Sequence, residues 1–480
     1  MEQKNINRRK FLIRSLQSAA GIGVIAGCDK RSIIGPDVRS PSAPNGLSQK
    51  LSFIADKTAY SIDLSWNAHD LTDNTGAKSE TSVTYNLYRK TDLETVFDTN
   101  PIASNLQSTT YSDNSPEVQS AFLRLADNPN IVFQYKISAV DASGNESDFS
   151  VVLSVPIKPF VDVFVVTNAQ VYAKNPDGKM AFQPEVAKSM LNSAVMEMTN
   201  QNAIPAAWES LFPSLTVDTL IGIKINTLAG LGGVNTQPVV VDAIVFGLTQ
   251  MLGGTFPAYN IIVFDDRNPS DQMKAAGYIL RNVQGSYRIA STSFNTTLDS
   301  SVPVATKQND SDLWGTTLNV AGVSQQFSKI IDTVDYLINV PVLKDHIQAG
   351  ITFSMKNLYG IVNYPQGMHD SMCCPFIPAL YNTLLNGIKI KDKIRLIVGD
   401  ALLACFTGGP TGAPSKYLNT IIVGTDPVAM DKWALDTINA NRNAKAQIAF
   451  GPDKDARHVF IASLPPYSLG STNYKVREVL

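Results

Sequence analysis

Residues 336–369 hold the side chains of this sequence that are best suited to chemistry. An apolar, β-branched run over 336–343 leads into Lys344-Asp345-His346, and Lys356, Asn357 and His369 follow, so two of the four histidines lie in this segment. Histidine exchanges a proton near neutral pH, and a lysine amine acts as a nucleophile or binds an anion. This clustering predicts a functional site. Either histidine alone would more often be a hydrogen-bonded structural residue.

Two adjacent cysteines extend the cluster. Cys373 and Cys374 follow His369 by four and five residues. Imidazole and thiolate are ligands for transition metals, so we treat these three side chains as candidate metal ligands. Vicinal cysteines chelate one ion poorly and Pro375 follows them directly, which leaves an unreactive or disulfide-linked pair as the alternative.

The segment requires a scaffold, and the pattern from residue 161 onward predicts one. Short apolar runs alternate with helical stretches, which is typical of an α/β domain with a largely parallel sheet. Polar residues follow the strands and are expected at the one edge where such sheets bind ligands. We expect strands at 162–166, 220–226, 260–266, 334–340, 394–400 and 419–423, helices at 184–200 and 239–252, and edge residues Lys224, Asn226, Asp265, Asp266, Lys344, His346 and Asp400. The run 336–346 is itself typical of a buried parallel strand whose carboxyl end is Lys344-Asp345-His346.

Several of these polar residues have a structural alternative, because Asp and Asn often cap a following helix. Asp265 and Asp266 are open to both interpretations. For Asp426, which precedes Pro427 at the start of a helical pattern, capping is the prediction. The glycine-rich stretch 408–412 lacks a lysine at phosphate-loop spacing and is expected to be an ordinary loop.

Residues 161–480 resemble the family called domain of unknown function 362. The resemblance runs through Gly222-Ile223-Lys224-Ile225-Asn226, residues 236–238, 339–346 and 352–360, and ends at Gly424-Thr425-Asp426-Pro427 and the residues up to Asp431. Many members carry a ferredoxin-like module with repeated cysteines. This chain has none, so an iron-sulfur cluster is not expected.

The order His346, Gly350, Lys356, Gly360, His369 is also similar to the nickel-pincer lactate racemase. That resemblance implies a base at His346, a covalently held pincer nucleotide on Lys356 and a metal ligand at His369. Two features depart from it: the glycine-rich stretch before the lysine is Thr352-Phe353-Ser354-Met355 here, and the second catalytic histidine has no counterpart. Without the analogy, the site predicts proton transfer by His346, with Lys344 or Lys224 holding a substrate anion.

The amino terminus resembles an export signal. Arg8-Arg9 precedes a short apolar run that ends in Ile25-Ala26-Gly27-Cys28, similar to a twin-arginine signal joined to a lipoprotein cleavage site. We expect a signal peptide over 1–28, lipid on Cys28, a flexible tether over 29–43 and a membrane-anchored protein facing the periplasm or cell exterior. Export of folded protein favours a cofactor loaded inside the cell.

Residues 44–159 show short alternating runs separated by turn residues, which predicts a β-sandwich. Trp66, Tyr85, Tyr88-Arg89 and Tyr135 match the fibronectin type III pattern, which this region resembles. Residues 114–130 look like an insertion with a helical turn, and His69 is expected to be a solvated loop residue. Such domains usually bind or space, so a protein or glycan partner is expected here.

The overall charge of the chain limits the kinds of partner that it can bind. A formal net charge of −2, with lysine and arginine spread along the chain, excludes a nucleic-acid footprint. The sequence therefore predicts a lipid-anchored enzyme that uses a divalent transition metal or a nucleotide-derived cofactor on a small anionic substrate. Lys356, Asn357, Lys224 and Asn226 would bind the cofactor. The alternative is a non-catalytic surface protein that recognises a glycan or another protein.

Overall fold

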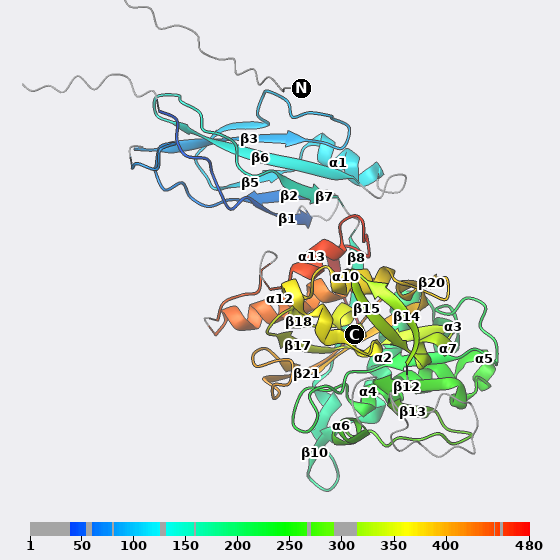
Figure 1. The fold of residues 1–480 in the computed structure, drawn as a ribbon. Helices are drawn as coiled ribbons and strands as arrows, with labels where there is room; N and C mark the ends of the chain where they lie inside the picture. The colour runs from blue at the N-terminus through cyan, green and yellow to red at the C-terminus, as the bar shows by residue number, and fades with distance from the viewer. Residues whose placement is uncertain are drawn as a thin grey trace, which may run out of the picture.

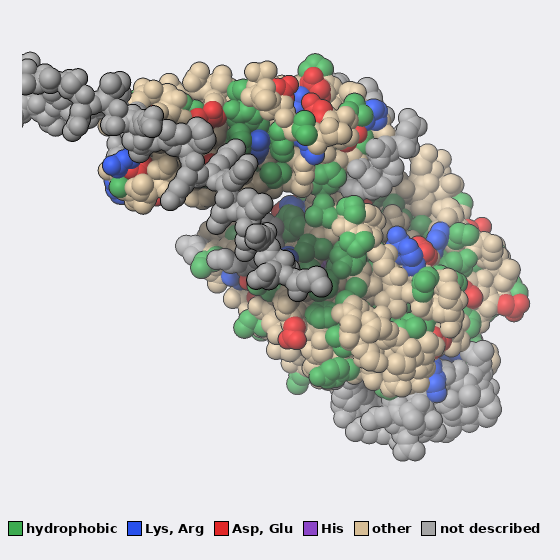
Figure 2. All heavy atoms as spheres, turned by 45° about the horizontal axis from the view of Figure 1, so that its top comes forward, with side chains coloured by type: hydrophobic (Ala, Val, Ile, Leu, Met, Phe, Trp, Pro, Cys, Tyr) green, Lys and Arg blue, Asp and Glu red, His purple; other side chains and the backbone are tan. Residues whose placement is uncertain are grey.

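The computed structural model describes residues 39–53, 60–78, 81–124, 131–157, 160–265, 270–291, 314–445, 447–451 and 455–480. The predicted signal peptide, Cys28 and most of the tether lie outside these residues, as does Asp266. Within the described ranges, no helix has both the length and the apolar character that crossing a membrane requires. On the face shown in Figure 2, acidic and basic side chains are interspersed.

The first region is an antiparallel β-sandwich, as predicted (Figure 1). Its strands alternate buried and half-exposed residues, so each sheet turns one face toward the shared core. Trp66, Tyr85 and Tyr135 are buried in that core. Helix α1 (Pro116–Leu123) confirms the helical turn expected in the insertion. One sheet has the order β1 (Ser48–Phe53), β2 (Tyr60–Ser65), β5 (Thr110–Asp113); the other has the order β4 (Ala103–Leu106), β3 (Val83–Lys90), β6 (Val132–Asp141), β7 (Leu153–Pro156).

The prediction that His69 is solvated was wrong. Its side chain is 2% exposed, and Nδ1 accepts a hydrogen bond from the Leu71 backbone N–H at 2.9 Å. Nε2 lies 3.0 Å from both the hydroxyl and the carbonyl oxygen of Ser42. A loop can bury an imidazole when the backbone satisfies both ring nitrogens, so His69 is a structural residue.

The second region is built on a mixed, mostly parallel sheet. The run of parallel neighbours confirms the prediction, while β22 is antiparallel to both β21 and β8. The main path is β13 (Arg288–Ser291), β12 (Ile261–Asp265), β11 (Ile221–Lys224), β16 (Tyr336–Asn339), β21 (Ile394–Cys405), β22 (Lys416–Gly424), β8 (Val161–Thr167), β23 (Tyr474–Glu478).

Helices cover both faces of this sheet, so its strands are buried on both sides and read as continuous apolar runs. One core contains buried residues of α2 (Pro184–Thr199) and α4 (Pro238–Thr249), packed against sheet residues such as Ile223 and Val263. The opposite core contains residues of α10 (Phe376–Asn382) and α12 (Pro427–Asn443). Both α2 and α4 begin with a proline, whose fixed φ suits the first helical turn.

Residues 336–346 do not form one strand, contrary to the sequence prediction. β16 ends at Asn339, and a separate strand β17 (Val342–His346) follows Pro341. Proline has no N–H for a ladder hydrogen bond, which explains the break. β17 pairs with β21 in parallel and with β18 (Gly350–Thr352) in an antiparallel hairpin. Lys344 and His346 therefore extend beyond β16, above the carboxyl ends of the central strands.

Candidate functional site

A cavity of about 490 Å³ lies where β11, β12 and β17 end. It brings together seven predicted site residues from the ends of β11 and β12 and from the segment 346–369. These are Lys224, Asn226, Asp265, His346, Lys356, Asn357 and His369; the other lining residues are Leu228, Ile347, Gln348, Thr352, Tyr359, Gly360, Pro365, Gln366 and Pro410. Lys344, Cys373, Cys374 and Asp400 do not line it.

Lys356 and His369 are in direct contact at the cavity. Lys356 Nζ lies 3.1 Å from His369 Nε2, and His369 Nδ1 lies 2.8 Å from the carbonyl oxygen of Pro365. A carbonyl only accepts, so Nδ1 of His369 carries the hydrogen and Nε2 accepts from the lysine. Lys356 is 7% exposed, and burial lowers its pKa to about 8. Within the described ranges, no carboxylate forms an ion pair with it.

His346 faces this pair with a defined tautomer. Its Nδ1 accepts hydrogen bonds from the backbone N–H groups of Gln348 and Ala349, both at 3.1 Å. Burial lowers the pKa of His346 to about 2, and the nearby Lys356 and His369 act in the same direction. The neutral ring therefore carries its hydrogen on Nε2 and offers a hydrogen-bond donor. The rings of His346 and His369 are nearly parallel, with centroids 5.7 Å apart.

Lys224 and Asp265 form a buried ion pair at the ends of β11 and β12. Lys224 Nζ donates to Asp265 Oδ1 at 3.0 Å and to the Ile225 carbonyl at 2.7 Å. Asp265 Oδ2 accepts from the N–H and hydroxyl of Thr227, at 2.6 and 2.8 Å. Gly360 lies against this pair, because a Cβ there would be 2.8 Å from Lys224 Nζ. These contacts fix the pair within the cavity wall.

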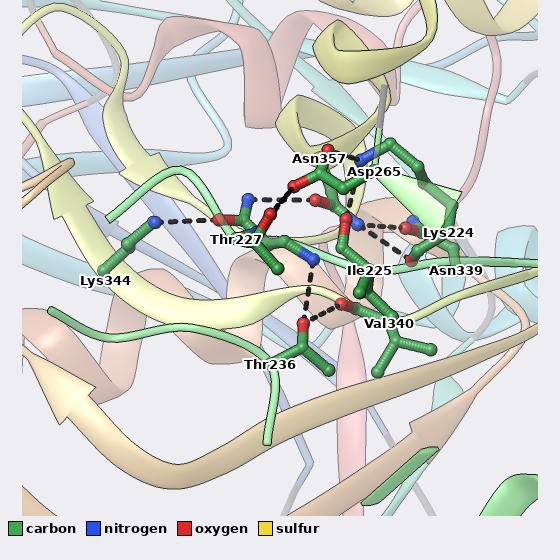
Figure 3. A network of polar contacts seen from close by, with 10 residues as sticks. Lys224, Ile225, Thr227, Thr236, Asp265, Asn339, Val340, Lys344 and Asn357 are labelled. Carbon is green, nitrogen blue, oxygen red and sulfur yellow. Dashed lines mark hydrogen bonds and ion pairs between the residues drawn. The ribbon is translucent and has the colours of Figure 1, made fainter. Parts of the chain in front are cut away.

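A chain of side-chain amides runs behind the cavity (Figure 3). Lys344 Nζ donates to Asn226 Oδ1 at 2.9 Å, and Asn226 Nδ2 donates to Asn357 Oδ1 at 3.0 Å. Asn357 Nδ2 donates to Asn339 Oδ1 at 2.8 Å. The predicted catalytic residue Lys344 is thus fully buried behind Asn226 and away from the cavity lining. Its burial lowers its pKa to about 7.

The predicted metal set is not assembled. Cys373 and Cys374 are buried, free thiols outside the cavity lining, so the disulfide alternative is also not observed. Burial raises the pKa of both thiols. Within the described ranges, no three His, Cys, Asp or Glu side chains are grouped so that they could hold a metal ion. His369 alone of the three candidates reaches the cavity.

Two aspartates are structural: the predicted edge residue Asp400 and the predicted helix cap Asp426. Asp400 accepts hydrogen bonds from the backbone N–H groups of Gln237 and Leu402, at 2.7 and 3.0 Å. Its burial raises its pKa to about 7. Asp426 caps α12, with Oδ1 accepting from Val428 and Ala429, both at 2.9 Å, which confirms the capping interpretation.

Sequence reasoning missed Thr352 as a site residue. It lines the cavity, is 4% exposed, and its hydroxyl has no hydrogen-bond partner among the described residues. A buried hydroxyl without a partner is uncommon, so this hydroxyl is available to bind a ligand. The only available signal was its position after Gly350, in the hairpin strand that places it opposite Lys344.

Comparisons with known proteins identify part of this region. Residues 221–436 match the family described as "Domain of unknown function (DUF362)". Part of the chain is similar to two solved fibronectin-type structures. One is an Fn3-like protein from Clostridium thermocellum, with 23% identity over 25% of this chain and 95% of that chain and a TM-score of 0.17. The other is the FN5 domain of Drosophila Lar, with 13% identity over 25% of this chain and 98% of that chain and a TM-score of 0.17. A third similar structure is the beta-1,2-glucanase from Parabacteroides distasonis, with 20% identity over 35% of this chain and 17% of that chain and a TM-score of 0.16. No curated protein matches.

Proposed function

We propose that the DUF362 domain is an enzyme that binds a small anionic substrate in this cavity. The observation that carries the proposal is Lys356, a buried ammonium group that lines the cavity and whose polar contact is a neutral imidazole. A buried cation without a carboxylate partner is costly, and an anionic ligand would offset that cost. The remaining lysine of the lining, Lys224, is already paired with Asp265.

Two further groups support an anion. His346 offers its Nε2 hydrogen, since backbone groups occupy Nδ1, and Thr352 offers an unpartnered hydroxyl. Both residues line the same cavity as Lys356. Hydrogen bonds in which one partner is ionised are roughly twice as strong as neutral ones. An anion at this position would satisfy all three groups.

The cofactor is part of the proposal, and the residues present are compatible with a covalently held nickel-pincer-type nucleotide. Attachment to Lys356 would remove its positive charge, so the ammonium contact with an anion belongs to the unloaded chain. In the loaded chain, His346 and Thr352 would supply the contacts to the substrate anion. Lys356 offers a cavity-facing amine of lowered pKa for attachment, and His369 Nε2 lies 3.1 Å from that amine as a single protein ligand. Because no group of three ligands occurs within the described ranges, the cofactor itself would have to supply most of the metal ligands. When bound, such a group would accept a hydride equivalent. His346 would orient the substrate through Nε2–H.

Binding is the direct test of the anion proposal. Calorimetric titration with acetate, succinate and inorganic phosphate at pH 7 should show binding of at least one anion. Lys356→Met should weaken that binding at least tenfold, which corresponds to about 1.4 kcal/mol. Lys389→Met, which removes an exposed lysine on β20 (Ile388–Lys389), should have no effect. Equal affinity of the Lys356 variant and the wild type would overturn the proposal.

The enzyme assignment has its own test, on protein from the native host. Intact mass and peptide mapping should locate a covalent adduct on Lys356, and metal analysis should find a transition metal. Unmodified mass together with no metal would remove the cofactor from the proposal.

We also propose that the protein is exported by the twin-arginine route and anchored through lipid on Cys28. Cys28→Ala should then move it from the membrane fraction to the soluble fraction.

A second candidate function is adhesion through the β-sandwich. Two neighbouring loops of this region expose apolar residues, and Lys136 joins them by lying over the rings of Phe97 and Phe149 at 4.7 and 3.3 Å. The exposed residues are Leu93, Val96, Phe149, Val151 and Val152. Exposed apolar clusters mark interaction sites. If adhesion is the function, the double variant His346→Ala, Lys356→Ala would leave the cellular phenotype unchanged.

A further inference from the structure

The amide chain behind the cavity has a fixed direction, because groups of defined polarity hold both ends. At one end Lys344 Nζ donates at 2.9 Å to Asn226, which turns Oδ1 toward it. At the other end the Ser354 carbonyl only accepts, and Asn339 Nδ2 donates to it at 2.8 Å. Between these ends each Nδ2 donates to the next Oδ1. Flipping one amide would set two donors or two acceptors against each other.

This direction determines which hydrogen-bond donors and acceptors of the two cavity-lining amides remain available to a ligand. Asn226 uses one Nδ2 hydrogen for Asn357, so one hydrogen remains. Asn357 uses both Nδ2 hydrogens, for Asn339 Oδ1 at 2.8 Å and the Lys224 carbonyl at 3.3 Å, so only an Oδ1 lone pair remains. A donor and an acceptor 3.0 Å apart therefore sit side by side in the wall.

We infer that Asn226 and Asn357 bind an amide edge of the ligand, meaning a carbonyl next to an N–H, and that Lys344 is the positioning residue that sets this preference. The inference rests on the proposed anion site, since Lys356 would hold the negative charge of the same molecule. A carbonyl oxygen would accept from Asn226 and the adjacent N–H would donate to Asn357. A second carboxylate at this position would meet the Asn357 oxygen with repulsion, so the wall selects against it.

Two sources share this chemistry: a primary carboxamide and a cyclic amide. Titration of the full chain with matched pairs separates them. Succinamate against succinate tests the carboxamide, and orotate against benzoate tests the cyclic amide. We expect at least one amide-bearing anion to bind about tenfold tighter than its partner lacking the amide, as expected when a site hydrogen-bonds a group that the competitor lacks. Equal affinities within both pairs would overturn the inference.

Variants of Lys344 separate positioning from packing. Lys344→Met removes the donor, frees Asn226 to turn over, and should abolish the tenfold preference while the amide-free anions still bind. Lys344→Gln retains an N–H donor and should restore the preference, which a purely structural role would not predict. Persistence of the preference in Lys344→Met would contradict the inference.

Asn226→Asp provides a second test should Lys344→Met fold poorly, because its carboxylate pairs with Lys344 and leaves no donor for the ligand carbonyl. It should lose the preference, and retention would again contradict the inference. Lys356→Met distinguishes the two proposals. If the wild type binds anions, Lys356→Met weakens that binding and neither ligand pair shows an amide preference, only this inference fails. When no anion binds at all, the proposed function fails together with it.

Discussion

The ammonium group of Lys356 lies 3.1 Å from Nε2 of His369, although the two residues are thirteen positions apart. Lys356 belongs to a short helix, α8 (Ser354–Asn357), and His369 follows the 3-10 turn η6 (Pro365–Met368). Tyr359 ties these segments together, since its hydroxyl donates to the Met368 carbonyl at 2.7 Å and its ring lies 4.2 Å from Lys356 Nζ. Contacts of Tyr359 therefore hold this pair in place at the cavity. The ammonium group of Lys356 lies beside the lone pair of His369 Nε2.

His346 is expected to stay neutral, with its hydrogen on Nε2, throughout the pH range in which most histidines titrate. Burial lowers its pKa to about 2, so protonation would occur only in strong acid. Nitrogen-15 NMR of labelled protein should show a constant Nε2–H tautomer from pH 5 to pH 8. The His346→Gln variant assigns the signal by its loss. A titration of this signal near pH 6.5 would contradict the expectation.

Lys344 should make stability depend on alkaline pH. Its folded pKa is lowered from 10.5 to about 7, so between these values the unfolded state binds a proton that the folded state does not. The free energy of unfolding of the wild type, measured relative to Lys344→Met, should therefore rise from pH 7 toward pH 10, by at most about 1.4 kcal/mol per pH unit. Chemical denaturation at several pH values measures it. The wild type measured relative to Lys389→Met, an exposed control, should show no such slope.

Gly360 should not tolerate a side chain. A Cβ at this position would lie 2.8 Å from Lys224 Nζ and 3.0 Å from Asp265 Oδ1, so Gly360→Ala would push the buried ion pair apart. We expect a loss of about 1–3 kcal/mol in unfolding free energy, as for other overpacked sites. Gly451→Ala is the matched control, because a Cβ there meets nothing within 4 Å. Similar unfolding midpoints for both variants would show that the close approach is unimportant.

Asp426 should stabilise the domain as a helix cap. Asp426→Ala leaves the N–H groups of Val428 and Ala429 without their acceptor, and also that of Ser471, which Oδ2 accepts at 2.9 Å. Loss of an N-cap typically costs about 1–2 kcal/mol, measurable by urea denaturation. Asp426→Asn keeps an oxygen acceptor and should lose less. Anion binding should be unchanged in both variants at temperatures where they remain folded.

The sequence by itself determined the features that depend on local patterns. Alternating residues such as those of 83–89 specified the sandwich strands, and apolar runs such as 260–264 specified the buried strands of the second region. Helix starts at Pro184 and Pro427 could be predicted because proline suits the first helical turn. The site residues His346, Lys356 and His369 were also predictable, since they are rare residue types that cluster within one segment.

Only the tertiary structure decided how these side chains act. The break at Pro341 moved β17 beyond the main strands, which placed His346 in the cavity and buried Lys344 behind Asn226. Backbone contacts from neighbouring residues chose the tautomer of His346. The direction of an amide chain, the pairing of Lys224 with Asp265 and the exclusion of Cys373 from the cavity all depend on segments far apart in the chain. A linear pattern reports which groups are present, whereas their protonation and polarity follow from neighbours that only folding supplies.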